Sequence, residues 1–394
     1  MSSHLMNTYN RLPVAFTRGE GVWLWDTSGK KYLDALAGIA VSGLGHAHPK
    51  LVRAIADQAG KVIHTSNIYE IPNQSALADR IAALSGMDES FFCSSGAEAN
   101  EAAIKLARLY GHQNGIQNAS IVVMEHAWHG RTLATLSATG SRKAQAGFEP
   151  LVPGFVRVPF NDAAAVKQAG EVNRNIVAVL VEVLQGEGGI YVADLEYVRF
   201  LRRICDEKGW LLMIDEVQSG VGRTGKWLAF QHAGIMPDVV TLAKGLGSGV
   251  PIGACVAAGR AKGVFKPGNH GSTFGGGPLA CAAGLATLAA MEEEALLDNA
   301  ARMGELIRQG FREALAGVSG VVEVRGMGLM IGIELDRPCG ELVKQALEAG
   351  LLINVTAERV IRLLPPLVIR EPEARELVAR LAPIVRNFLA KPAA

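Results

Sequence analysis

Residues 211–220 read LLMIDEVQSG, an apolar run that ends in two acids, Asp215 and Glu216. An ionised carboxylate that is removed from water needs a cationic or hydrogen-bonding partner. The nearest basic residues in the sequence are Arg223 and Lys226, and neither is adjacent to the acids. We therefore expect the partner of Asp215 to come from elsewhere in the fold or from a bound molecule.

The apolar run is one of several such runs between residues 120 and 258, among them SIVVMEH, NIVAVLVEVL, DVVTLAK and IGACVAA. Continuous apolar runs, as opposed to alternating ones, are typical of parallel strands with helices on both faces. The intervening segments have helical spacing. This pattern predicts an α/β fold with a mostly parallel sheet. After Pro278 we expect one long helical stretch to about residue 316 and then a smaller α+β unit.

The composition narrows the class of protein. The chain has 394 residues, of which 49% are hydrophobic and 20% charged, and its net charge is +1. This balance is typical of a globular protein and shows no basic excess for nucleic acid. The five cysteines form no CxxC pair, which favours reduced core thiols. The first residues show no basic and apolar leader, and PLACAAGLATLAAM is too short to span a bilayer, so we expect a cytoplasmic protein without a membrane partner.

Ligands of open parallel sheets bind beyond the carboxyl ends of the strands, where both Asp215 and Lys244 are expected. Lys244 in TLAKGLGSGVPIGA ends an apolar strand, and desolvation would lower its pKa and make it a nucleophile for carbonyls. The alternative readings are a turn-capping Asp and a Lys that reaches the surface. Each alternative is favoured when its residue is considered alone.

Two further segments could bind phosphate. In SSGAEANEAAIKLAR, Ser95 and Glu98 fit a capping box and Gly96 allows close backbone approach, so the helix start is a possible anion site. In HGSTFGGGPLACAA, Ser272 and Thr273 lie in a Gly-rich loop before a helix. An ordinary well-capped helix explains the first segment equally well.

The remaining candidates could bind flat or anionic groups. HAWHGRT supplies Trp128 and a carboxylate-binding Arg131, while VEVLQGEGG and VIRLLPPLVI supply Glu187 and Arg362. The histidines of HAWHGRT lack a third ligand, which favours turn or pocket histidines, and we expect no metal. Arg362 could also be an edge-strand residue that faces solvent. Together the candidates provide a nucleophilic amine, a carboxylate, a phosphate cradle, a stacking platform and two arginines, which is the set that pyridoxal 5′-phosphate (PLP) requires.

The ordered segments SSGAEANEAA, WHGRT, QGEGG, IDEVQSGVGRTGK, LAKGLGSGVPIGA and HGSTFGG resemble those of the class III PLP-dependent aminotransferases of fold type I. The resemblance covers nearly the whole chain. It implies a large domain at residues 49–285 with a seven-stranded sheet. It also implies a smaller domain built from residues 1–48 and 286–394.

The resemblance also implies roles for individual residues. Lys244 would carry the cofactor and shuttle the proton, Asp215 would hold the pyridinium nitrogen and Gln218 the phenolic oxygen. The phosphate would be bound by Ser95, Gly96 and Ala97 and by Ser272 and Thr273 of the other subunit, so we expect a homodimer. Trp128 would stack on the ring, Arg131 would bind the substrate carboxylate, and Glu187 would neutralise Arg362 until a dicarboxylate displaces it. Ala97 and Trp128 replace the Thr and Phe of many relatives, which could shift cofactor affinity.

The implied reaction transfers the δ-amino group of N2-acetylornithine to 2-oxoglutarate in a ping-pong sequence through a pyridoxamine form. Ornithine, succinylornithine and 4-aminobutyrate remain alternative amino donors. A catalytically silent cofactor-binding protein is disfavoured because Lys244, Asp215, Arg131 and Arg362 are all present. A dinucleotide-binding oxidoreductase is disfavoured because GLGSGVPIG precedes a strand and does not follow the first strand of a βαβ unit.

Overall fold

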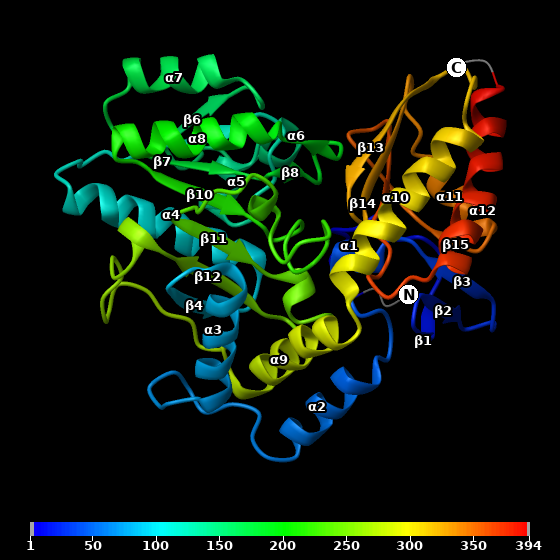
Figure 1. Cartoon of the computed structure of the whole chain (residues 1–394), viewed down its shortest axis with the longest axis horizontal. Helices are drawn as coiled ribbons and strands as arrows, with labels where there is room; N and C mark the ends of the chain where they lie inside the picture. The colour runs from blue at the N-terminus through cyan, green and yellow to red at the C-terminus, as the bar shows by residue number, and fades with distance from the viewer. Residues whose placement is uncertain (1–3, 392–394) are drawn as a thin grey trace.

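The computed structural model describes residues 4–391 and is built around a seven-stranded sheet (Figure 1). The strand order is β4 (Glu89–Cys93), β12 (Gly253–Ala257), β11 (Val239–Leu242), β10 (Leu211–Asp215), β7 (Ile176–Val181), β5 (Ser120–Met124) and β6 (Phe155–Val158). β12 runs antiparallel to both of its neighbours, and the other neighbouring pairs are parallel. The prediction of a mostly parallel seven-stranded sheet is therefore confirmed.

Helices cover both faces of this sheet. Along β10, Leu211 and Met213 pack into the apolar cluster that contains α4 (Gly96–Gln113), whereas Leu212 and Ile214 pack into the cluster that contains α8 (Leu195–Lys208). Because both faces of a strand are buried, every position must be apolar, which explains the continuous runs in the sequence. The other helices of this part are α2 (Pro49–Ala59), α3 (Pro72–Ser85), α5 (Leu133–Ala138), α6 (Arg142–Gln145), α7 (Ala163–Val172) and α9 (Pro278–Glu293).

A smaller α+β unit combines both ends of the chain (Figure 1). Its first sheet joins β1 (Phe16–Glu20), β2 (Trp23–Asp26) and β3 (Lys31–Asp34) to β15 (Leu351–Leu352), which is parallel to β3. Its second sheet has the order β13 (Val321–Met327), β14 (Met330–Leu335), β17 (Val360–Leu363) and β16 (Asn354–Thr356). Helices α10 (Leu296–Ala314), α11 (Leu342–Glu348) and α12 (Glu371–Leu389) complete it, and α1 (Ala37–Ala40) follows β3. The exact domain boundaries stay a prediction.

The helical stretch after Pro278 differs from the prediction. It consists of two helices, α9 and α10, because Ala295 adopts a left-handed conformation with a φ of 49° between them. Helical periodicity continues on both sides of such a single-residue break, so the sequence pattern does not reveal it.

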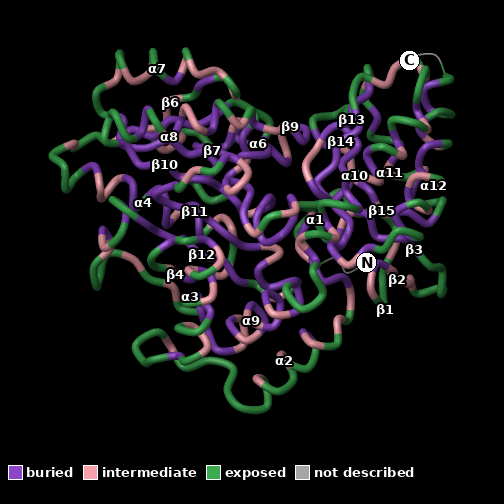
Figure 2. Tube along the Cα trace, viewed as in Figure 1, coloured by how far each residue is buried: buried purple, intermediate pink, exposed green. Residues whose placement is uncertain are grey.

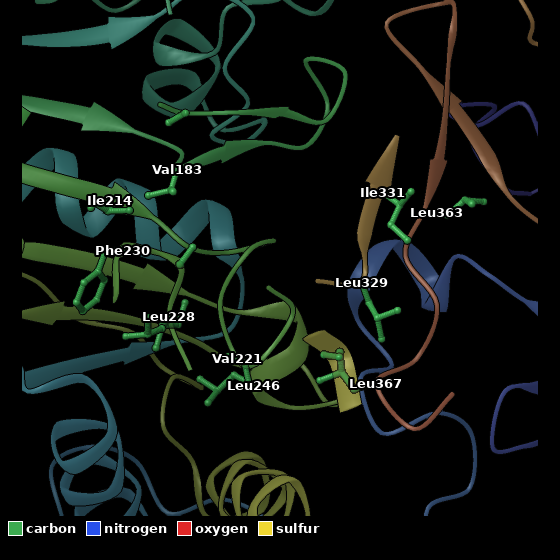
Figure 3. Packing of buried hydrophobic residues seen from close by; sticks show 14 of the residues in the cluster. Val183, Ile214, Val221, Leu228, Phe230, Leu246, Leu329, Ile331, Leu363 and Leu367 are labelled. Atoms are coloured by element: carbon green, nitrogen blue, oxygen red, sulfur yellow. The ribbon is translucent and has the colours of Figure 1, made fainter. Parts of the chain in front are cut away.

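Apolar packing joins the large sheet to the smaller unit. Figure 2 shows buried chain continuing from one part to the other, and Figure 3 shows Val221 and Leu246 on the side that faces Leu329 and Leu367. The backbone carbonyl of Arg223 also accepts a hydrogen bond from the backbone N–H of Leu329, at 3.0 Å. This packing fixes the geometry of a site formed between the two parts.

Within residues 4–391, no helix is both long and apolar enough to cross a bilayer.

Candidate active site

A cavity of about 400 Å³ lies beyond the carboxyl ends of the parallel strands. Its volume falls within the range of small-molecule sites. The structure brings eight of the predicted residues together in its lining: Ser95, Gly96, Ala97, Trp128, Arg131, Asp215, Gln218 and Lys244.

Lys244 begins a short 3₁₀ turn, Lys244–Leu246, with one residue between it and the end of β11. Its φ of 41° is unusual for a residue with a side chain, and such conformations occur often at functional sites. Burial lowers the pKa of Lys244, while the negative charges of Asp215 and Glu187 oppose this shift. A lowered pKa increases the fraction of neutral amine, which is the form that attacks carbonyls.

Asp215 obtains its partners from three segments of the chain. Its Oδ2 accepts hydrogen bonds from Asn100 Nδ2 at 2.7 Å and from His129 Nδ1 at 2.8 Å, and its Oδ1 accepts one from the backbone of Val217 at 2.9 Å. Thr241 Oγ1 donates to Asn100 Oδ1 at 2.7 Å. These bonds fix the orientation of the carboxylate.

The register of the sheet explains this network. Asp215 on β10 is paired with Thr241 on β11. The residue two positions before each of them packs into the cluster that contains α4, so the side chains of Asp215 and Thr241 lie on the α4 side of the sheet. Asn100 lies on the buried face of α4 together with Ala103, Ile104 and Ala107. Asn100 was not predicted from the sequence, although a polar residue within an apolar helical stripe is a detectable signal of a buried hydrogen bond.

His129 is the second residue of this network, and it lines the cavity as the predicted pocket histidine, although its pairing with Asp215 was not predicted. Its side chain is fully buried against Asp215, and its Nε2 has no hydrogen-bond partner among the described residues. Within residues 4–391, no group of three or more His, Cys, Asp or Glu side chains is arranged to hold a metal ion. The geometry of His129 is that of an aspartate-orienting histidine.

Glu182 is a buried acid that follows β7. Its carboxylate accepts hydrogen bonds from the backbone of Trp128 at 2.9 Å and of Gly186 at 3.3 Å. Burial and the nearby charge of Asp215 raise the pKa of Glu182. Glu182 therefore connects the aromatic residue of the cavity with the loop that carries Glu187.

The start of α4 has the expected form of an anion site. Ser95 is the N-cap, and its Oγ accepts a hydrogen bond from the backbone of Glu98 at 3.2 Å, while Glu98 accepts from Ser94 N at 2.7 Å. The Cβ atom of any larger residue at Gly96 would come within 2.5 Å of Val217. Glycine is therefore needed here for the close packing of the helix start against the β10 exit.

Arg362 of β17 is fully buried and forms an ion pair with Glu187, with 2.6 Å between Nη1 and Oε1. Its Nε donates to Asn354 Oδ1 at 3.0 Å, and Nη1 also reaches Gln218 Oε1 at 3.3 Å. This placement excludes the alternative of an edge arginine in solvent.

The guanidinium of Arg131 lies 4.7 Å from the ring centre of Trp128.

Ser272 and Thr273 are not part of the Lys244 cavity within one chain. They line a separate surface hollow together with Phe91, Glu98, Glu101 and His270. Thr273 is exposed, and the adjacent Phe274 is 70% exposed. Their contribution to a neighbouring subunit remains a prediction.

The residues present in the cavity fit PLP. Asp215 is a buried carboxylate that could pair with a ring nitrogen, Lys244 is an amine for the aldehyde, and the start of α4 offers N–H groups for the phosphate. Fold and site thus define an enzyme of the PLP-dependent transferase class.

Comparison with known proteins is consistent with this class. The family described as "Aminotransferase class-III" matches residues 5–385, and the chain belongs to this family, whose cofactor is PLP. Acetylornithine aminotransferase 1 of Bordetella bronchiseptica is 63% identical over 391 residues, which cover 99% of this chain and 100% of the relative.

Two solved structures are also similar. An ornithine aminotransferase from Toxoplasma gondii, described with PLP at partial occupancy in its active site, has a TM-score of 0.95 and 34% identity, and covers 99% of this chain and 94% of its own. An acetylornithine aminotransferase from Elizabethkingia anophelis has a TM-score of 0.87 and 36% identity, with 98% and 97% coverage.

Proposed function

We propose that this enzyme transfers the δ-amino group of N2-acetylornithine to 2-oxoglutarate, giving N-acetylglutamate 5-semialdehyde and glutamate. The observation that carries the proposal is the ion pair between buried Arg362 and half-buried Glu187, beside Lys244. A removable partner on the arginine lets one site accept substrates with different numbers of carboxylates. The names of the similar enzymes from Bordetella and Elizabethkingia support acetylornithine as the amino donor.

When bound, PLP supplies an aldehyde that accepts amino groups and a protonated ring that withdraws electrons. Asp215, held by Asn100 and His129, would keep the ring nitrogen protonated. Lys244 would hold the aldehyde and move the proton at the carbon that carries the substrate amine. The N–H groups of Gly96 and Ala97 would hold the phosphate, and Trp128 would lie against the ring.

The two substrates place different demands on the arginines. Acetylornithine carries one carboxylate, remote from its reacting amine, whereas 2-oxoglutarate has a second carboxylate beside its reacting carbonyl. Arg131 would bind the remote carboxylate of both substrates. Arg362 would bind the second carboxylate after Glu187 has moved away, and Glu187 would mask Arg362 in the half-reaction with acetylornithine.

A spectral titration of the purified PLP-loaded enzyme tests the proposal. Acetylornithine, ornithine, succinylornithine and 4-aminobutyrate are added separately, and the conversion of the cofactor is followed with stopped-flow absorbance. We expect the highest kcat/KM with acetylornithine. A higher value with any of the other three amines would reassign the donor.

We propose further that the active unit is a homodimer in which Thr273 reaches the cofactor phosphate of the partner subunit. Apolar side chains of Ile63, Ile68 and Tyr69 are exposed next to Phe274. Asn67 ties this segment to the Thr273 loop through hydrogen bonds to the carbonyls of Ser272 and Gly275, both at 2.9 Å. An exposed apolar patch of this kind fits a second copy of the chain.

Subunit mixing tests the shared site. Lys244→Ala and Thr273→Ala proteins are unfolded, mixed and refolded together. If Thr273 acts across the interface, each mixed dimer contains one intact site and activity returns, whereas action within one subunit restores none. Sedimentation of the wild type as an active monomer would contradict the dimer.

We propose further that the enzyme lies in the cytoplasm. All five cysteines are free and buried, which suits a reducing compartment. Fractionation of cells that produce the protein at its native level would test this location.

A further inference from the structure

The loop that carries Glu187 is attached to the smaller unit by its backbone. The loop is the tip of a short hairpin between β8 (Leu184–Gln185) and β9 (Tyr191–Val192), and it belongs to the part that contains Lys244. Thr356 Oγ1 of β16 donates a hydrogen bond to the carbonyl of Glu187. The backbone and the carboxylate of Glu187 thus both contact the smaller unit.

Arg325 of β13 provides the larger part of this attachment. Its Nη2 donates to the carbonyl of Gly189 at 2.6 Å, and its Nε donates to the carbonyl of Ile190 at 3.1 Å. Its guanidinium also lies 3.9 Å from the ring centre of Tyr191. The buried side chain of Arg325 therefore contacts Gly189, Ile190 and Tyr191, which follow Glu187 closely in the loop.

Glu334 of β14 holds Arg325 in this orientation. Its Oε2 accepts hydrogen bonds from Arg325 Nη1 at 2.5 Å and from the Tyr191 hydroxyl at 3.1 Å. Arg359 contacts the other oxygen of Glu334 at 2.9 Å, but its side chain is 51% exposed. The planar guanidinium can satisfy Glu334 and both carbonyls at once, which a lysine cannot do.

The conformation of the loop explains why it needs this support. Ile190 is β-branched and fully buried, yet its φ is 57°, and Gly189 before it has a φ of 121°. A left-handed conformation is unfavourable for a β-branched residue and persists only where contacts enforce it. Arg325 binds the carbonyls of both residues and thereby enforces it.

We propose that Arg325 is a positioning residue that sets selectivity between the two substrates by holding the Glu187 loop so that the carboxylate covers Arg362. This inference rests on the proposed function of the Glu187–Arg362 pair. With the backbone held, Glu187 uncovers Arg362 by rotation of its side chain, and the loop stays in place. Without Arg325, the loop relaxes, Glu187 covers Arg362 less often, and dicarboxylates gain relative to acetylornithine.

A double-mutant cycle tests the inference. The ratio of kcat/KM for acetylornithine to that for glutamate is measured in single half-reactions for Arg325→Lys, Glu187→Ala and the double variant. We expect Arg325→Lys to lower the ratio about tenfold in the wild-type background and to change it less than about twofold in the Glu187→Ala background. Equal shifts in both backgrounds would show a general structural role and overturn the inference. Arg359→Ala is the matched control, since it also removes a partner of Glu334, and its ratio should stay at the wild-type value.

A second variant keeps the test valid if Arg325→Lys does not fold. Thr356→Val keeps the side-chain shape and removes the hydrogen bond to the Glu187 carbonyl. It should lower the same ratio in the wild-type background, and an unchanged ratio would count against the attachment of the loop.

Two measurements separate this inference from the proposed function. Hydrogen exchange of the amides of residues 188–192 should become faster in Arg325→Lys, and binding of the unreactive dicarboxylate glutarate, measured by calorimetry, should become tighter. Neither measurement involves acetylornithine, so both remain decisive if the enzyme uses another amino donor. Unchanged exchange together with unchanged glutarate affinity would refute the role of Arg325.

Discussion

Arg362→Ala should separate the two halves of the reaction. Arg362 is fully buried and donates hydrogen bonds to Glu187, Asn354 and Gln218. Its guanidinium is therefore already desolvated when the carboxylate of a dicarboxylate substrate binds to it. Loss of such a desolvated charge pair costs about 2–5 kcal/mol, which corresponds to a fall of about thirtyfold or more in kcat/KM for glutamate and 2-oxoglutarate. Acetylornithine places no carboxylate on Arg362, and we expect its value to change by less than about threefold.

Single-turnover kinetics measure each half alone. The PLP form of the variant is mixed with acetylornithine or glutamate, and the aminated form is mixed with 2-oxoglutarate. Arg131→Ala serves as a contrast, because it should slow both halves. Circular dichroism and thermal unfolding establish that each variant is folded.

Equal slowing of both halves by Arg362→Ala would refute the reasoning. In that case Arg362 would support the cavity as a whole, and the ion pair with Glu187 would be structural. A larger loss with acetylornithine than with glutamate would reverse the assignment of the two arginines.

Three further predictions concern residues that line the cavity. Lys244→Ala should abolish turnover, and mass spectrometry after borohydride reduction should show a cofactor adduct on Lys244 of the wild type; an adduct on another lysine contradicts the assignment. Asn100→Leu removes the hydrogen bond to the charged Asp215, which is worth about 1.5–3 kcal/mol, so PLP should bind the apo-protein at least about tenfold more weakly. Thr241→Val, which removes only the bond to Asn100, should have a smaller effect. A PLP titration in which Asn100→Leu and the wild type bind with equal affinity would exclude this role of Asn100. Burial raises the pKa of Glu182 from its ordinary value of 4.5 to about 8, so folding favours the protonated form. The resulting stability is fully present below the ordinary pKa and is lost as the pH rises through the folded-state pKa. Glu182→Gln removes this titration, so it should destabilise the apo-protein in urea more at about pH 5 than at about pH 8.5, and the reverse order would show that the shift has the opposite sign.

Much of the fold and part of the site could be predicted from the sequence because the signals are local. A strand buried on both faces must be apolar throughout, so runs such as LLMID mark the sheet without knowledge of their neighbours. Lys244 and Asp215 are recognisable because each directly follows such a run, and parallel strands bring their carboxyl ends to one edge. The N-cap of Ser95 is also a local signal: its hydroxyl accepts from the Glu98 N–H as predicted, although Glu98 accepts from the Ser94 N–H and does not complete the capping box with the Ser95 N–H.

The partners of these residues were decided by the tertiary structure alone. Asn100 contacts both Asp215 and Thr241 because α4 packs across the ends of β10 and β11. Glu187 contacts Arg362, which lies 175 residues further along the chain. Arg325 and Ile190 likewise come together only where β13 packs against the Glu187 loop. A sequence pattern records which face of an element is buried, but it does not record which side chain of another element lies opposite. That choice depends on the packing of whole helices and sheets, which brings polar groups far apart in the chain within hydrogen-bonding distance.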